Sequence, residues 1–425
     1  MIALEFSAPA AGHGDGITTL IIALAVILAA AKLGGELAVR IGQPAVLGEL
    51  VGGVVLGNMS LIGVGWLEPM AANETISLLA ELGVLILLFE VGLEATVRDM
   101  LKVGLPSLLV AVLGVVTPFA LGWGAGALML PAESPYVHAF LGATLCATSV
   151  GITARVLKDL GKSQTPEARV ILGAAVIDDV LGLIILSVVA GAIQAADRGG
   201  ALSLGETGLV LGKATAFLVG ALALGVVISS RLFRLTSRLR VRGVLLTTAL
   251  VFCFVLAYLS GVFGLAPIVG AYAAGLILED VHFRDFKNRG EHPLEELIEP
   301  VATVLVPIFF VLMGMRVDLT AFGRQEVLGF AALLTVAAIV GKQACALGAM
   351  GGGLDRLSVG IGMIPRGEVG LIFASIGMSL TIGGEPVVDE AIYSAVVIMV
   401  IVTTMATPPA LKWSLARGAR APVVR

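Results

Sequence analysis

Charged residues are scarce in this chain: Lys, Arg, Asp and Glu make up 14% of its 425 residues, whereas hydrophobic residues make up 58%. No soluble domain of this length tolerates that composition, so the mean hydropathy of +1.02 indicates a polytopic α-helical membrane protein. Cysteine is rare too. Cys146, Cys253 and Cys345 all fall inside apolar runs, which favours small core residues over disulfides or metal ligands.

Two further absences exclude particular features, namely an ordinary signal peptide and a buried histidine relay. The first 19 residues hold no Lys or Arg, so they lack the basic start of an ordinary signal peptide. The four histidines, at positions 13, 138, 282 and 292, lie outside the apolar cores, which argues against a buried histidine relay. We expect no enzymatic activity, no cofactor and no nucleic-acid partner from such a chain.

About thirteen apolar segments are long enough to span a bilayer, if short and broken segments are allowed. Their approximate bounds are 17–33, 43–58, 74–96, 102–130, 137–157, 165–195, 206–231, 242–260, 264–279, 293–316, 327–350, 357–379 and 390–411. With the N-terminus outside, 21 of the 27 Lys and Arg residues fall in cytoplasmic connections, three fall outside and three lie inside helices. The positive-inside rule therefore favours an N-out, C-in topology.

The chain also resembles itself. GELVGGVVL at 48–56 is echoed by GAYAAGLIL at 270–278, and five segments from 43 to 195 match five from 264 to 411. The copies are seven segments apart, an odd number, so the second enters the membrane from the opposite side. An extra segment (17–33) precedes the first copy, and two linking segments (206–260) separate the copies. Inverted repeats of this kind place transport sites near the bilayer midplane.

The fourth segment of each copy carries helix-weakening residues near its middle. In the first copy, at 147–153, these include Thr148 and Ser149. In the second copy, at 362–370, Pro365 cannot donate to the carbonyl four residues earlier, and glycines loosen the same turn. The pattern predicts two broken helices whose ends bring partial charges to the midplane. Arg366 and Glu368 could pair, compensate a half-helix end or contact an ion, and the sequence leaves these roles open.

Asp178 and Asp179 lie side by side within the apolar run 174–186. A charged side chain at this depth costs roughly 2.5–3.5 kcal/mol on insertion scales, and such groups usually face a water-filled cavity and handle ions or protons. Lys342 is equally deep and needs a carboxylate partner, for which Asp178, Asp179 and Glu368 are candidates. A cation arriving at the aspartates would compete with Lys342 and with protons, which is antiport in physical terms. Thr148 and Ser149 offer hydroxyl oxygens to a hard cation, although core packing explains them nearly as well.

Four motifs in this order resemble the bacterial monovalent cation–proton antiporters of the NapA type, distant relatives of NhaA. They are the Asp-Asp pair, Gly-Lys at 341–342, IPRGEVG at 364–370 and QPAVLGE at 43–49. The resemblance implies a homodimer in the bacterial inner membrane. It implies a core domain (102–195 plus 327–411) that moves against a dimerisation domain (17–96 plus 242–316), with two broken helices crossing in the core.

The same resemblance implies roles for individual residues. Asp179 would be the main carrier of sodium and protons, and Asp178 would pair with Lys342 and release it when sodium binds. Sodium would contact both aspartates and Thr148, and lithium would be a further substrate. Paired carboxylates resemble the electrogenic members, which exchange two protons per sodium ion. One departure is that NhaA has an aspartate at its first break, where this chain has threonine and serine. A second is that we expect no cytosolic nucleotide-binding domain of the KefC type after the last helix.

Three other functions are compatible with part of this sequence pattern. A potassium–proton exchanger on the same scaffold is the main alternative. An intramembrane aspartyl protease needs two aspartates on different helices, whereas these are adjacent on one helix. A channel or ion sensor is a third option, but inverted repeats with buried carboxylates favour alternating access.

Overall fold

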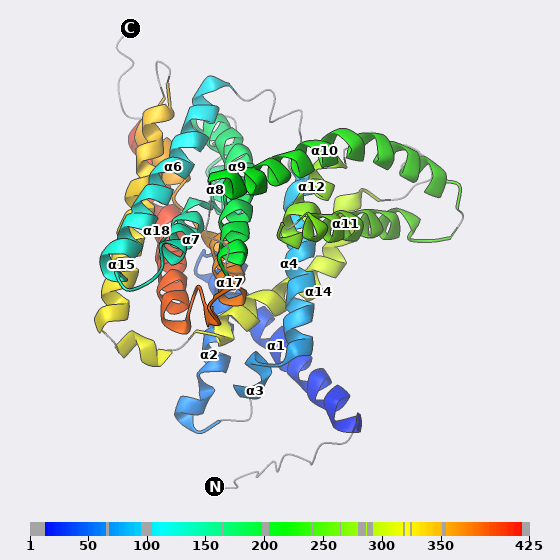
Figure 1. Ribbon diagram of the computed structural model, residues 1–425, viewed down its shortest axis with the longest axis horizontal. Coiled ribbons are helices and arrows are strands. Elements are labelled where there is room, and N and C mark those ends of the chain that lie inside the picture. The colour runs from blue at the N-terminus through cyan, green and yellow to red at the C-terminus, as the bar shows by residue number, and fades with distance from the viewer. Residues whose placement is uncertain are drawn as a thin grey trace. The chain divides into compact units, whose positions relative to one another are not determined.

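The computed structural model describes residues 13–64, 68–94, 104–162, 165–197, 204–239, 241–263, 265–278, 286, 292–317, 319–323, 325–350 and 354–418. Within these ranges the chain is helical apart from connecting turns and one antiparallel pair of two-residue strands, Thr381–Ile382 (β1) and Glu385–Pro386 (β2). The predicted all-α class is therefore confirmed for the described part of the chain (Figure 1).

The helices follow the predicted apolar segments closely. The first half of the chain forms α1 (His13–Arg40), α2 (Ala45–Gly57), a 3-10 turn (Met59–Ile62), α3 (Glu68–Ala71), α4 (Glu74–Glu94), α6 (Leu105–Met129), α7 (Pro135–Cys146), α8 (Val150–Asp159) and α9 (Pro166–Asp197). The second half forms α10 (Leu204–Thr236), α11 (Val244–Val262), α12 (Pro267–Ile277), α14 (Leu294–Met315), a 3-10 turn (Leu319–Gly323), α15 (Gln325–Ala344), a 3-10 turn (Cys345–Gly348), α16 (Arg356–Gly362), α17 (Gly367–Ser379) and α18 (Glu390–Gly418). Every predicted segment overlaps at least one of these helices.

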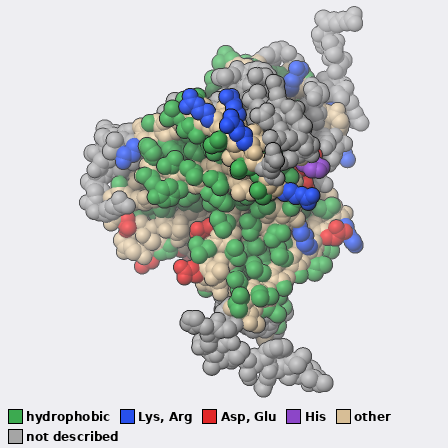
Figure 2. Space-filling model, turned by 90° about the vertical axis from the view of Figure 1, so that its right-hand side faces the viewer, with side chains coloured by type: hydrophobic (Ala, Val, Ile, Leu, Met, Phe, Trp, Pro, Cys, Tyr) green, Lys and Arg blue, Asp and Glu red, His purple; other side chains and the backbone are tan. Residues whose placement is uncertain are grey.

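Eight of the described helices are long and apolar enough to cross a membrane, and α2, α12 and most of α17 are shorter apolar helices. Large hydrophobic side chains stay exposed on several of them, such as Leu33 on α1 and Tyr258 on α11. Hydrophobic side chains cover much of the face in Figure 2, as expected where lipid is the solvent. The protein is thus an integral membrane protein, while the total of thirteen spans, the inverted repeats and the N-out orientation remain predictions.

The chain divides into two compact units, residues 1–83 with 303–316 and residues 84–302 with 317–425. In the first unit, α1 and α2 touch through Gly34 and Gly48, where a Cβ on either glycine would overlap the other's carbonyl. Gly53 and Gly314 make a similar contact between α2 and the end of α14. Small residues give membrane helices this close backbone approach. The predicted core and dimerisation domains are a different partition of the chain, and they stay a prediction.

In the second unit, helices far apart in sequence pack together in two hydrophobic clusters. One cluster joins α6, α9, the 3-10 turn after α15, and α16, through residues that include Val110, Ile171, Cys345 and Val359. A second cluster joins α8, α9, α16 and the C-terminal half of α18. Segments 105–197 and 325–418 therefore pack against each other, and this packing carries the charged residues to one place.

Candidate functional site

The site begins on α9, which carries the two aspartates in its middle. Valine, isoleucine and leucine flank the pair, so the helix continues through it without a break. Asp178 is buried, whereas Asp179, one step further around the helix, is half-buried. The two carboxylates therefore have different surroundings although they are neighbours in sequence, as their separation of about 100° around the helix requires.

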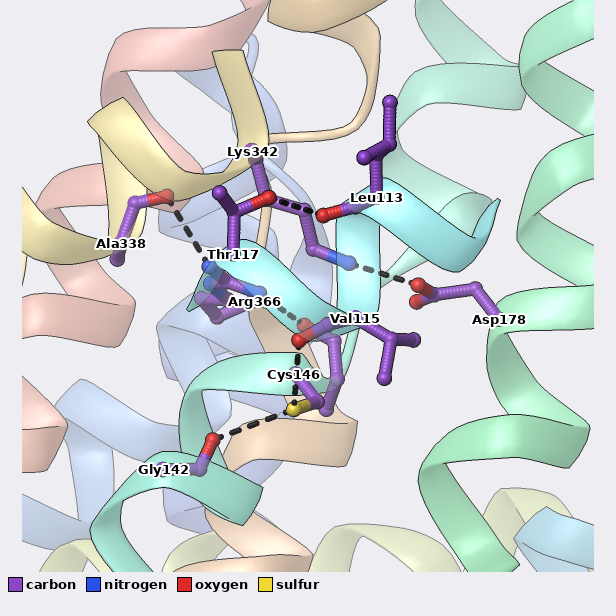
Figure 3. Close-up of polar contacts among 10 residues, drawn as sticks. Leu113, Val115, Thr117, Gly142, Cys146, Asp178, Ala338, Lys342 and Arg366 are labelled. Atoms are coloured by element: carbon purple, nitrogen blue, oxygen red, sulfur yellow. Dashed lines mark hydrogen bonds and ion pairs between the residues drawn. The ribbon is translucent and has the colours of Figure 1, made fainter. Parts of the chain in front are cut away.

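Lys342, in the last turn of α15, meets the first of these carboxylates. Its Nζ lies 2.8 Å from Asp178 Oδ1, and both side chains are fully buried (Figure 3). Of the three partners that the sequence allowed, the structure brings Lys342 to Asp178. Burying two charges costs free energy unless they are paired and hydrogen-bonded. Each of these two residues can therefore be buried only because the other neutralises its charge.

Helix α6 packs directly against this ion pair through Gly114. A Cβ at this position would lie 3.5 Å from Lys342 Nζ and 3.6 Å from Asp178 Oδ1, so the glycine leaves no side chain between the helix and the charges. One turn later, Pro118 has no N–H to donate to the Gly114 carbonyl, and Thr117 Oγ1 donates to the Leu113 carbonyl. The Gly114 carbonyl is thus left without its usual helical donor, in the same turn of α6 that faces the pair.

The two predicted breaks occur where the sequence placed them. Helix α7 ends at Cys146 and α8 begins at Val150; α16 ends at Gly362 and α17 begins at Gly367. The breaks touch one another, because Ser149 N–H donates to the Pro365 carbonyl (2.8 Å) and Thr153 Oγ1 donates to the Gly362 carbonyl (2.6 Å). Four half-helix ends, with partial charges of both signs, therefore meet at this point.

Gly367 makes the contact between the breaks possible. Its φ of +42° lies in the left-handed region that favours glycine, and a Cβ there would come within 2.5 Å of both Cβ and Oγ of Ser149. The first break is also fastened to α6, since the Cys146 thiol lies 3.4 Å from the Val115 carbonyl and 3.2 Å from the Gly142 carbonyl (Figure 3).

Arg366 is fully buried, and it bridges the breaks to α15. Its guanidinium donates to the Ala147 carbonyl (2.6 Å), at the C-terminal end of α7, and to the Ala338 carbonyl (3.1 Å), one turn before Lys342 (Figure 3). A cation at a helix C-terminus offsets the partial negative charge there, which is one of the roles the sequence left open. The Glu368 side chain lies outside the described part of the structure, so its pairing with Arg366 stays a prediction.

Thr148 supplies a further polar atom within the first break. Its Oγ1 is buried and makes no hydrogen bond to any described residue, and the same is true of Asp178 Oδ2. Buried polar oxygens without partners cost free energy, roughly 1–3 kcal/mol each. A cation or a proton that reached either oxygen would recover that cost.

Sequence reasoning missed the residues that shape the site without carrying a charge. Gly114 was not singled out, because a glycine in a glycine-rich apolar helix gives no distinguishing signal. The 3.6-residue period of α6 places Gly114 and Pro118 on one face, and this was the available clue.

Interrupted helices that meet beside a buried carboxylate–ammonium pair define a class, the secondary ion transporters. Comparison with known proteins agrees with this class. The family described as "Sodium/hydrogen exchanger, transmembrane" matches residues 21–416. The chain therefore belongs to the transmembrane sodium/hydrogen exchanger family, and it is a transporter, not an enzyme.

Individual relatives cover nearly the whole chain. The protein is 38% identical to the high-affinity Na(+)/H(+) antiporter NhaS3 of Synechocystis sp., over 92% of this chain and 89% of that one. It is 37% identical to the Na(+)/H(+)-K(+) antiporter GerN of Bacillus cereus, over 92% and 95%. The solved structure of the sodium proton antiporter MjNhaP1 from Methanocaldococcus jannaschii shares the fold, with a TM-score of 0.72 at 16% identity over 95% of this chain and 99% of that one. The predicted resemblance to bacterial monovalent cation–proton antiporters is confirmed.

Proposed function

We propose that this protein is an electrogenic sodium–proton antiporter that works by alternating access. Sodium, or lithium, and protons compete for the Asp178–Asp179 pair in the middle of the membrane. The observation that carries the proposal is the buried ion pair between Asp178 and Lys342, whose second carboxylate oxygen has no partner among the described residues. Such a carboxylate can exchange one positive partner for another without moving the helix.

The cycle follows from charge balance at this pair. When sodium enters, Asp179 gives up its proton and Asp178 leaves the Lys342 ammonium, which loses a proton in turn. When sodium leaves on the other side, Asp179 and Lys342 each take up a proton and the ion pair re-forms. Two protons thus move against one sodium ion, and one net charge crosses the membrane per cycle. Thr148 Oγ1 would be a further sodium ligand, and Arg366 would hold the two breaks in register.

Motion of the site across the bilayer belongs to the proposal. We propose that the core (102–195 plus 327–411) moves against the dimerisation domain (17–96 plus 242–316), which also joins two copies of the chain. The names of NhaS3 and GerN, which are both bacterial antiporters of sodium and protons, support this function and a bacterial inner membrane location.

The test is exchange by purified protein in liposomes, read with a pH-sensitive dye, for sodium, lithium and potassium in turn. Asp179→Asn is expected to abolish exchange with each cation. Asp197→Asn is the matched control, because Asp197 is the exposed last residue of the same helix and an asparagine oxygen can still accept from Gly383 N–H. Full exchange by the Asp179 variant would remove Asp179 from the carrier role.

An imposed membrane potential tests the two-proton stoichiometry. We expect exchange to speed up or slow down with the sign of the potential, and Lys342→Gln to weaken that response because one proton site is lost. An exchange rate that ignores the potential in the unaltered protein would rule out the electrogenic cycle.

A potassium–proton exchanger is the second candidate. The observation that favours it is the name of the relative GerN, a Na(+)/H(+)-K(+) antiporter. The same cation panel decides: a dye response to potassium as large as that to sodium would favour the second candidate.

A further inference from the structure

Tyr272, on α12, carries a polar atom that the proposed cycle does not use. The side chain is 1% exposed, and its hydroxyl is buried without a hydrogen bond to any described residue. A phenol normally finds a partner when it is buried, because its apolar ring and polar tip have different needs. Leaving such a hydroxyl unmatched costs roughly 1–3 kcal/mol, so a phenylalanine would pack here at lower cost.

The ring points toward α9, just past the aspartates. Together with Leu265 and Val269 it borders a small space of about 10 Å³, whose other side is Val180, Leu183, Ile184 and Ser187 of α9. Asp179 precedes Leu183 by four residues, which places both on one face of the helix. Val180, which also borders this space, is the next residue after Asp179 on α9. The Tyr272 hydroxyl makes no hydrogen bond to any described residue, so contact between it and Asp179 requires a bridging water or ion.

The backbone of α12 cannot move to find the hydroxyl another partner. Gly275 packs against α4, where a Cβ would overlap the Phe89 carbonyl, and Gly270 packs against α11, where a Cβ would overlap the Leu256 carbonyl. These two contacts fix the helix on two sides. The space beside the ring is at the lower limit for a single water molecule.

We propose that the Tyr272 hydroxyl oxygen is a ligand for the sodium ion at Asp179, supplied from outside the helices that carry the rest of the site. A hydroxyl has two lone pairs for a hard cation and a proton that can turn toward a bridging water when the cation is absent. This inference rests on the proposed function. It adds that α12, which belongs to the proposed dimerisation domain, completes the site in the conformation described here and leaves it when the core moves.

The test removes one oxygen atom. Tyr272→Phe keeps the ring in its packed place, so the variant is expected to fold as well as the unaltered protein. Tyr258→Phe is the matched control, because Tyr258 lies on α11 with its side chain 72% exposed. We expect the KM for sodium to rise about fivefold to tenfold in Tyr272→Phe, the effect of losing one hydrogen-bond-strength contact, and to stay unchanged in Tyr258→Phe.

A second measurement is the rise in unfolding temperature of the protein when sodium chloride is added. Tyr272→Phe should unfold at the same or a higher temperature than the unaltered protein without sodium, and should gain less from added sodium. A purely structural tyrosine would give the opposite pattern, a lower starting temperature with the sodium gain intact, and that pattern would overturn the inference. An unchanged KM with an unchanged sodium gain would overturn it too.

The two proposals fail separately. If Asp179→Asn keeps full exchange, the proposed function is wrong, whatever Tyr272→Phe does. If Asp179→Asn abolishes exchange while Tyr272→Phe matches the unaltered protein in both measurements, only the role of Tyr272 is wrong.

Discussion

The ion pair between Asp178 and Lys342 gives the sharpest energetic prediction. Both side chains are fully buried and their charged atoms lie 2.8 Å apart. Replacing one partner leaves the other charge buried without compensation, which typically costs 3–5 kcal/mol. We therefore expect Asp178→Asn and Lys342→Gln each to lower the free energy of unfolding by about 3–5 kcal/mol. The double variant should lose about 2 kcal/mol less than the sum of the two, because Asn and Gln can hydrogen-bond as a neutral pair.

The chain contains a matched control for this cycle. Arg40 and Glu36 on α1 form an ion pair with the same 2.8 Å separation, but their side chains are 71% and 58% exposed. Exposed pairs spaced four residues apart on a helix contribute only about 0.3–0.5 kcal/mol. The two pairs share the same separation of charged atoms and differ strongly in burial, although the exposed pair lies within one helix and the buried pair joins two.

Denaturant titration of the purified protein in detergent micelles measures both double-mutant cycles. The buried pair is expected to show a coupling energy several times that of the exposed pair. Equal coupling in the two cycles would refute the reasoning, because it would mean that water reaches Lys342 and screens its charge as it does that of Arg40. The ion pair would then be exposed to water, and a water-free carboxylate that exchanges Lys342 for sodium would no longer describe the site.

Three further predictions test other parts of the site. Gly367→Ala should destabilise the protein by more than Gly383→Ala, because both glycines have positive φ but only Gly367 meets a neighbour, Ser149; thermal unfolding of the two variants compares them. Arg366→Lys should lower the unfolding temperature and the exchange rate, since an ammonium cannot reach both carbonyls that the guanidinium fork spans; an unchanged rate would show that the charge alone suffices. The KM for sodium should rise as pH falls, by about tenfold per pH unit for each proton that sodium must displace; a KM that is constant between pH 6 and pH 8 would contradict competition at one site.

Much of the fold could be predicted because its causes are local. A bilayer forces backbone groups to bond within each segment, so long apolar runs become helices wherever they occur. The second break could be placed because Pro365 removes a donor and Gly367 permits positive φ, and the helix stops within that turn. The first break, at Thr148 and Ser149, rested on the weaker signal of small polar residues, and it too was predicted at the right place.

The site was harder to predict because its contacts join residues that are far apart in sequence. Charge balance showed that Lys342 needed a carboxylate, but three candidates were open, and the structure brings it to Asp178, 164 residues away. The choice depends on how α9 and α15 rotate against α6, which no local pattern reports. Residues without charge, such as Gly114 and Tyr272, stayed hidden for the same reason.

The sequence by itself determined that this protein lies in the membrane, where its helices break and which apolar segments carry charged residues, since each of these follows from a free-energy cost within one segment. The tertiary structure decided the partners: which carboxylate holds Lys342 and which carbonyls receive Arg366. Those choices are made by the packing of side chains between segments, and a buried charge binds whichever opposite group that packing brings within reach.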